Sequence, residues 1–202
     1  VPSGSPVRLI TPPIAWIRTI EPEDASGPLA RAYEQAKTPS GTVDNVMKAH
    51  SLRPRTMEGH LALYRSVLHA EDITLPLWFL EMIASYVSMI NGCDYSLSHH
   101  FRNARQLMTD PARADAAYAA LEAGRPEQAF DGKELALLRY AGKLTAAVGA
   151  MEQADIEALR GAGADDGEIL EVNQVCAYFN YSNRLLNGLG ISTTGDTIGY
   201  YD

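Results

Sequence analysis

Four polar side chains near the middle of the chain have types and spacings that could support acid–base or thiol chemistry: Glu81, Cys93, Ser96 and His100. Glu81 is the only charged residue of the apolar segment 77–90. A carboxylate in such a segment is either buried with a partner or directed outward into solvent. Burial without a cation raises the pKa of a carboxyl group, which suits general acid–base catalysis. Glu81 is therefore a candidate catalytic residue, with a structural ion pair to an arginine as the alternative.

Cys93 follows the helix-breaking pair Asn91-Gly92 and falls in the first turn of the next predicted helix. Free backbone N–H groups and the helix dipole favour a thiolate there. At 100° per residue, Cys93, Ser96 and His100 share one helix face, whereas His99 lies about 100° from His100 and is the poorer partner. Ser96 and His100 can touch as an i, i+4 pair. About 10 Å of helix rise separates Cys93 from His100, so their contact needs a distorted turn or a relay through Ser96 or water.

The elements that must position these residues are predicted to be helices. From residue 29 onward apolar residues recur with helical spacing, and Gly or Pro residues separate the periodic segments. No convincing strand alternation is present. The predicted helices span residues 29–36, 46–51, 55–70, 77–90, 93–108, 112–123, 133–148, 155–159 and 166–186. The predicted fold class is all-α.

The predicted layout has a proline-rich extended arm at 1–28, a helical domain at 29–190 and an irregular tail at 191–202. A partly disordered tail is the alternative for the first segment. The arm is expected to be anchored by four apolar residues: Ile14, Trp16, Ile17 and Ile20.

Two acidic residues start similar runs, which raises the possibility of two related helical units. Cys93, Ser96 and His100 follow Glu81 by 12, 15 and 19 positions. The same offsets from Glu168 give Asn180, Asn183 and Asn187. A chance coincidence of acidic helix starts and amide-rich turns is the alternative.

Composition limits the class of protein. The 202 residues carry 17 basic and 25 acidic side chains, a formal charge of −8, without a run of Lys or Arg, which argues against nucleic acid or an anionic membrane as partner. No stretch of 18 apolar residues is present, and no signal peptide is recognised at the start of the sequence. Two cysteines make no disulfide framework. We expect a cytoplasmic globular protein.

The motif Glu81-x11-Cys93-x-x-Ser96-x3-His100 resembles the carboxymuconolactone decarboxylase/AhpD-like superfamily, in its peroxidase-related, alkylhydroperoxidase-like branch. The pattern of that family is Glu, eleven residues, Cys-x-x-Cys, three residues, His. The segment His50-Ser-Leu-Arg-Pro54 is also similar to the family, and so are four segments of the C-terminal half: Ala141–Leu144, Asp155–Arg160, Ala177–Arg184 and Gly188–Gly190. The resemblance therefore covers roughly residues 45–191.

The resemblance implies an AhpD-like helical bundle, assembled as a homo-oligomer (dimer or hexamer), that reduces alkyl hydroperoxides as an antioxidant thiol peroxidase. By that resemblance Glu81 and His100 form a proton relay, Cys93 is the first motif cysteine, and an external thiol is the reductant. No cofactor is expected. Ser96 replaces the second cysteine, and a hydroxyl can neither attack peroxide efficiently nor resolve a sulfenic acid.

Several interpretations therefore stay open. Cys93 could act alone with an external thiol, or a serine could have been substituted for an original cysteine at Ser96. Glu81 and His100 could instead serve a non-redox acid–base enzyme of the decarboxylase or lactone-processing type, or the site could be catalytically degenerate. Cys176, the other thiol, lies in an apolar helical run and is expected to be a buried structural residue. No metal site is expected, since His99 and His100 point in different directions on a helix.

Overall fold

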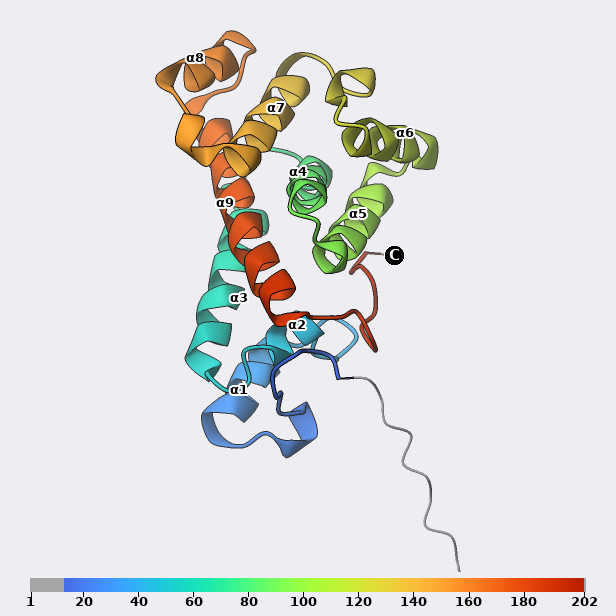
Figure 1. Cartoon of the computed structure of the whole chain (residues 1–202), viewed down its shortest axis with the longest axis vertical. Coiled ribbons are helices and arrows are strands. Elements are labelled where there is room, and N and C mark those ends of the chain that lie inside the picture. Colours follow the sequence, from blue (N-terminus) through green and yellow to red (C-terminus); the bar gives the residue numbers. More distant parts are fainter. Residues whose placement is uncertain (1–12, 202) are drawn as a thin grey trace, which may run out of the picture.

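The computed structural model describes residues 13–201 and is built from helices; no strand occurs within that range. This confirms the all-α prediction. The α-helices, coloured along the chain in Figure 1, are α1 (Gly27–Gln35), α2 (Asn45–Lys48), α3 (Pro54–Leu68), α4 (Leu77–Ile90), α5 (Asp94–Met108), α6 (Pro111–Glu122), α7 (Gly132–Ala146), α8 (Gln153–Gly161) and α9 (Asp166–Leu189).

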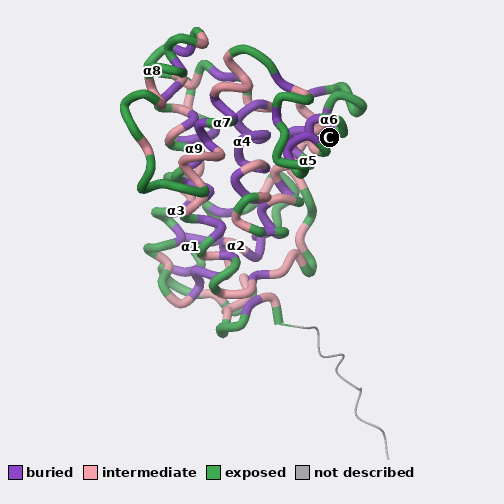
Figure 2. Tube along the Cα trace, turned by 45° about the horizontal axis from the view of Figure 1, so that its top comes forward, coloured by how far each residue is buried: buried purple, intermediate pink, exposed green. Residues whose placement is uncertain are grey.

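Helix α4 lies at the centre of the bundle, between α5, α7 and α9 (Figure 1). It is apolar on nearly every side, which is the pattern of a helix buried all round. Nine of its fourteen residues are buried, Glu81 among them, and Figure 2 shows the purple of buried residues concentrated there. The site carboxylate is therefore held on a helix that is buried in the core of the fold.

The hairpin between α4 and α5 is formed at Asn91 and Gly92. Gly92 has φ +60°, a left-handed conformation that glycine adopts without steric cost. The backbone N–H of Cys93 then donates to the Ser88 carbonyl at 2.9 Å, and Cys93 becomes the N-cap of α5. The break predicted from sequence thus turns the chain back along α4 and puts two site-bearing helices side by side.

The Glu168 segment has a different shape. Asp166–Leu189 is one uninterrupted helix, α9, whereas the Glu81 segment is a hairpin of two helices. Glu168 closes a capping box with Asp165 and pairs with Lys133 at 2.5 Å near the surface. The two acidic residues therefore have different surroundings despite their equal offsets.

The N-terminal arm is tied to the C-terminal end of α9 by backbone hydrogen bonds. Trp16 N–H donates to the Leu189 carbonyl at 2.8 Å, and Ser192 N–H donates to the Ile14 carbonyl at 3.0 Å. Of the expected anchors, Ile14 and Ile20 pack against buried clusters. Trp16, by contrast, is 78% exposed and Ile17 is 40% exposed, because the arm is fixed here through its backbone. Residues 1–12 of the predicted arm lie outside the described range.

Within the described residues, no helix has the length and apolar character needed to cross a membrane.

Candidate active site

A buried carboxylate–imidazole pair joins α4 to α5. Glu81 Oε2 lies 2.6 Å from His100 Nδ1, and the Glu81 side chain has no solvent exposure while that of His100 is 11% exposed. A carboxylate at Nδ1 makes that nitrogen the N–H donor of a neutral imidazole and leaves Nε2 as the lone-pair nitrogen. No hydrogen bond from residues 13–201 occupies Nε2. The pair has the geometry of a general base held by an orienting carboxylate.

The second oxygen of Glu81 is held by an amide from the next turn of α5. Asn103 Nδ2 donates to Glu81 Oε1 at 3.1 Å, and Asn103 is itself fully buried. The Phe179 ring packs against the His100 imidazole edge-on, with centroids 4.5 Å apart. Both oxygens of Glu81 and one face of His100 are therefore fixed, although the sequence alone did not single out Asn103 or Phe179.

Ser96 lies one turn before His100 but is paired with a different partner. The Ser88 hydroxyl lies 2.9 Å from the Ser96 hydroxyl, and Asn183 Nδ2 donates to Ser88 at 3.3 Å. No hydrogen bond joins Ser96 to His100 in the described part of the chain. Ser96 is thus in a polar cluster with α4 and α9, on the i, i+4 face that the sequence predicted for it.

Cys93 is almost fully buried, with 1% exposure. Burial raises the pKa of its thiol, while hydrogen bonds from the Ser96 backbone and the Asn183 side chain lower it. The nearby charge of Asp94 raises it further. The net direction is upward, so the thiol form is favoured over thiolate at neutral pH.

A cavity of about 250 Å³ opens beside the imidazole. Ser96 and His100 line it, whereas Cys93 is not among its lining residues. Glu81 reaches the cavity only through His100. Two of the four predicted residues, Ser96 and His100, therefore line the cavity. Glu81 lies behind His100, and the sulfur of Cys93 is packed in a buried apolar cluster.

Aromatic side chains from distant segments make up much of the cavity wall. They are Tyr64, Tyr95, Tyr178, Tyr200 and Tyr201. Two of them belong to the C-terminal segment, which crosses the bundle beside α5 (Figure 1). The irregular tail predicted from sequence is therefore part of the cavity.

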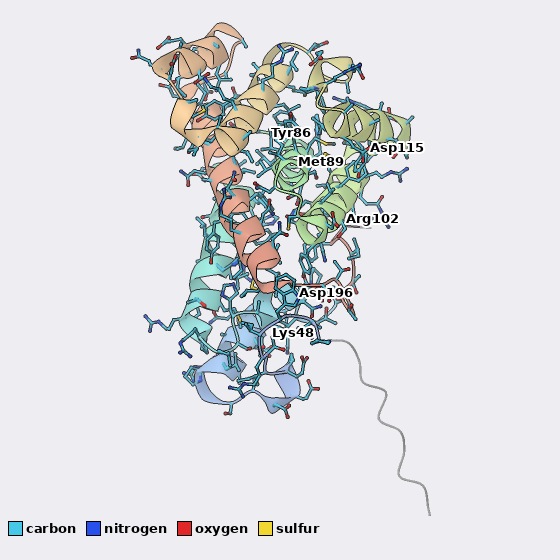
Figure 3. All side chains as sticks on the ribbon, viewed as in Figure 1. Lys48, Tyr86, Met89, Arg102, Asp115 and Asp196 are labelled. Atoms are coloured by element: carbon cyan, nitrogen blue, oxygen red, sulfur yellow. The ribbon has the colours of Figure 1, made fainter. Side chains whose placement is uncertain are left out.

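Two hydrogen bonds between a tyrosine and a carboxylate hold the C-terminal segment against the rest of the protein. The Tyr200 hydroxyl donates to Asp44 at 2.5 Å, and the Tyr95 hydroxyl donates to Asp196 at 2.5 Å. Burial raises the pKa of Asp44 to about 6 and also raises that of Asp196, and the charge of Lys48 partly opposes both shifts. Figure 3 shows Lys48 and Asp196 in the same region of the molecule, at the end of α2.

His99, which the sequence ranked below His100, also lines the cavity. Its ring stacks on Tyr95 with centroids 4.9 Å apart, and neither ring nitrogen has a hydrogen-bond partner among the described residues, although Nε2 lies 3.9 Å from the Asp196 carboxylate. Burial lowers its pKa to about 4, so the ring is neutral at pH 7. His99 serves as an aromatic wall residue rather than as a second base.

The remaining thiol, Cys176, is fully buried on α9 and close to the Thr145 hydroxyl, 3.3 Å away. Within residues 13–201, no three His, Cys, Asp or Glu side chains gather closely enough to hold a metal ion.

Structural comparison places this helical arrangement among known folds. An "alkylhydroperoxidase AhpD core: uncharacterized peroxidase-related protein" from Ralstonia eutropha JMP134 superposes with a TM-score of 0.79 at 24% identity, covering 92% of this chain and 95% of its own. A peroxidase-related protein from Silicibacter sp. TM1040 gives a TM-score of 0.71 at 29% identity, covering 85% of this chain and 89% of its own. The chain has the AhpD-like fold. The resemblance seen in the motif is thereby confirmed.

AhpD-like proteins differ in their chemistry. The debrominase Bmp8, solved in complex with 2,3,4-tribromopyrrole, also superposes, with a TM-score of 0.68 at 16% identity over 91% of this chain and 92% of its own. No family model and no curated protein matches the chain. The AhpD-like fold therefore leaves the reaction to be argued from the site itself.

Proposed function

We propose that this AhpD-like protein is an acid–base enzyme for a small organic molecule, with His100 as the base. The observation that carries the proposal is the 2.6 Å contact between Glu81 and His100 Nδ1 at the wall of the cavity. Glu81 fixes the tautomer and stabilises the imidazolium formed when Nε2 takes a proton. Imidazole is the side chain most often used as a general base, and a carboxylate partner orients it for proton transfer.

The size and walls of the cavity define the substrate class. A dry cavity of roughly 150 Å³ accepts benzene, so one of about 250 Å³ holds a ring-sized molecule with a few substituents. Tyrosine rings provide apolar faces, and their hydroxyls provide hydrogen bonds. Small keto acids and lactones with an acidic C–H group are therefore the substrates to test.

The experiment is proton exchange in D₂O. A panel of small keto acids and lactones is incubated with the protein, and loss of the acidic C–H signal is followed by NMR. We expect His100→Ala and Glu81→Gln to reduce the exchange rate by at least 10²-fold, a typical contribution of general acid–base catalysis. Cys93→Ala should retain it. Exchange that survives His100→Ala would refute the assignment of the base.

A second candidate is thiol-dependent reduction of hydroperoxides by Cys93, with an external thiol as resolving partner. The hydrogen bonds that the Ser96 backbone and the Asn183 side chain direct at the sulfur favour it, and burial opposes it. Peroxide should then consume one fast-reacting thiol at neutral pH, with sulfenate located at Cys93 by mass spectrometry. Peroxide reduction that is lost in Cys93→Ala and weakened in His100→Ala, in a protein without C–H exchange activity, would favour this candidate over acid–base catalysis.

We also propose that the chain forms a homo-oligomer, as the resemblance implies. Large apolar side chains at three separate places are exposed: Trp16 at 78%, Val148 at 69% and Leu170 at 59%. Exposed apolar side chains of this kind are positions that a partner subunit can cover in an assembly. Light scattering at micromolar concentration should give a mass above 22.0 kDa, and a monomer would contradict the proposal.

A further inference from the structure

A row of four hydrogen-bonded side chains that does not include Glu81 or His100 leads from the cavity to the surface. Tyr178 OH lies 2.7 Å from His60 Nε2, and His60 Nδ1 lies 3.0 Å from His50 Nε2. His50 Nδ1 then lies 2.8 Å from the Thr56 hydroxyl. Tyr178 lines the cavity, and Thr56 is exposed at the start of α3. Both ends of the row therefore meet exchangeable protons.

The surface end determines the direction of every hydrogen bond in the row. The Thr56 hydroxyl donates its one proton to the Arg53 carbonyl at 2.8 Å. It can then only accept from His50 Nδ1, which makes His50 Nε2 the lone-pair nitrogen of a neutral ring. His60 accordingly donates from Nδ1 to His50, and its Nε2 accepts from the Tyr178 hydroxyl. The Tyr178 proton is directed away from the cavity, so the Tyr178 oxygen is left as an acceptor.

Both imidazoles in the row are neutral. Burial lowers the pKa of His60 to about 3, with a further contribution from His50, and burial lowers the pKa of His50 as well. His60 and His50 are 2% and 6% exposed, so direct contact with water does not deliver protons to either ring. A neutral imidazole accepts a proton at one nitrogen while releasing one from the other, which is the property a relay needs.

We propose that Tyr178, His60 and His50 form a proton relay that connects the cavity with solvent at Thr56. This inference rests on the proposed acid–base function, since it supplies a second proton acceptor for the same bound molecule. Tyr178 is the residue that faces that molecule. His60, His50 and Thr56 act through it as positioning residues.

The proton balance of one transfer is closed. The Tyr178 oxygen takes a proton from a molecule in the cavity as its own hydroxyl proton passes to His60 Nε2. The Nδ1 proton of His60 passes to His50 Nε2, the Nδ1 proton of His50 passes to the Thr56 oxygen, and the Thr56 proton passes to water. The four side chains are neutral before and after, both rings have exchanged tautomer, and the net change is one proton moved from the molecule in the cavity to water. A proton taken up from water at Thr56 and delivered to the cavity restores the starting state, which suits a reaction that removes one proton and later returns one.

The tautomers of the two rings test the relay without any activity assay. Free neutral histidine favours Nε2–H, whereas the relay requires Nδ1–H at both His50 and His60, which ¹⁵N NMR of the imidazole nitrogens distinguishes. In Thr56→Val the acceptor for His50 is removed. We expect both rings to change to Nε2–H and the exchange of the His60 ring proton with water to slow by at least tenfold.

The control is Ser66→Ala on the same helix, where an exposed hydroxyl likewise donates to the carbonyl three residues earlier, at 2.8 Å from Leu63 O. It should change neither tautomer nor exchange rate, and Thr56→Ser should behave as the original protein.

If Thr56→Val leaves the His60 tautomer and exchange rate unchanged in a protein that still unfolds cooperatively, the side chains form separate structural hydrogen bonds and the relay is refuted. Coupled tautomers in a protein without C–H exchange activity would support the relay and contradict the proposed function, so the two failures are distinguishable.

Discussion

Asn103 connects the Glu81 carboxylate to the C-terminal segment: its amide nitrogen donates to Glu81 Oε1 at 3.1 Å, and its amide oxygen accepts from the Tyr200 backbone N–H at 2.9 Å. One side chain thus links the base-orienting carboxylate with the segment that contributes Tyr200 and Tyr201 to the cavity wall. The position of the tail and the position of the acid are therefore coupled through a single residue.

Replacement of Asn103 should destabilise the protein. Asn103→Ala leaves one oxygen of a fully buried carboxylate without a donor, which costs about 1–3 kcal/mol or more for a charged group. The free energy of unfolding, measured by urea denaturation, should fall by that amount. Asn173→Ala is the control, because it removes a half-buried hydrogen bond, which the Asn173 side-chain amide donates to the Tyr140 hydroxyl at 2.8 Å. A smaller loss in Asn103→Ala than in the control would contradict this account of Glu81.

Removing the charge of Asp44 should stabilise the protein above pH 6. Burial raises the pKa of this carboxyl from 3.8 to about 6 in the folded state. Between these values the unfolded chain ionises before the folded one, so stability decreases as pH rises through this window and is constant above it. One pKa unit corresponds to about 1.4 kcal/mol, which makes a gain of roughly 1–3 kcal/mol reasonable for Asp44→Asn at pH 7.

The Asp44→Asn measurement is urea denaturation at pH 4 and pH 7. The two proteins should have similar stability at pH 4, where the original carboxyl is protonated in the folded state, and the amide oxygen can still accept from Tyr200. Asp115→Asn is the control, because that carboxyl is exposed and paired with Arg105. An Asp44→Asn protein that is less stable than the original at pH 7 would show that the ionised form is favoured.

The helices could be predicted from sequence because their signals are local. Residues 77–90 and 166–186 were assigned from apolar periodicity, and Gly92 from its position in a break; the structure has α4 at Leu77–Ile90 and α9 from Asp166. The pairing of Glu81 with His100 was implied by the family resemblance of the motif, and the hairpin of α4 and α5 brings the two residues together. These features depend on spacing along one stretch of chain.

The partners that meet across long separations could not be predicted. Asp44 and Tyr200 are 156 positions apart, and His60 and Tyr178 are 118 apart. Single polar residues in loops or on helices carry no period that links them, so nothing in the sequence pairs them. The exposure of Trp16 was missed for a related reason: backbone hydrogen bonds hold the arm, and apolar residue type alone does not report them.

Gly190 should be far less tolerant of substitution than Gly188. Gly190 caps α9 at φ +59°, and an added Cβ would lie 2.1 Å from an atom of the Trp16 ring. Gly190→Ala should therefore lower stability by at least about 1 kcal/mol, from the left-handed backbone alone. Gly188, within α9, has open space around its Cα, and Gly188→Ala should raise stability by about 0.5–1 kcal/mol. Equal melting temperatures for the two variants would contradict the contact between Trp16 and Gly190.

Replacing Ser96 by cysteine should create a thiol peroxidase in this cavity. Ser96 lines the cavity one helical turn from His100, so a thiol there borders the cavity close to a base, whereas Cys93 does not line the cavity. A thiolate formed at position 96 can attack peroxide, and Cys93, three residues earlier in the same turn, can resolve the sulfenic acid as a disulfide. Peroxide consumption in the presence of dithiothreitol should appear in Ser96→Cys and be absent or slow in the original protein.

Ser98→Cys is the control, because residue 98 is exposed and outside this cavity. The gain should disappear in the double variants Ser96→Cys/His100→Ala and Ser96→Cys/Cys93→Ala, the first through loss of the base and the second through loss of the resolving thiol. Equal activity in Ser96→Cys and Ser98→Cys would mean that the cavity and His100 contribute nothing to thiol reactivity.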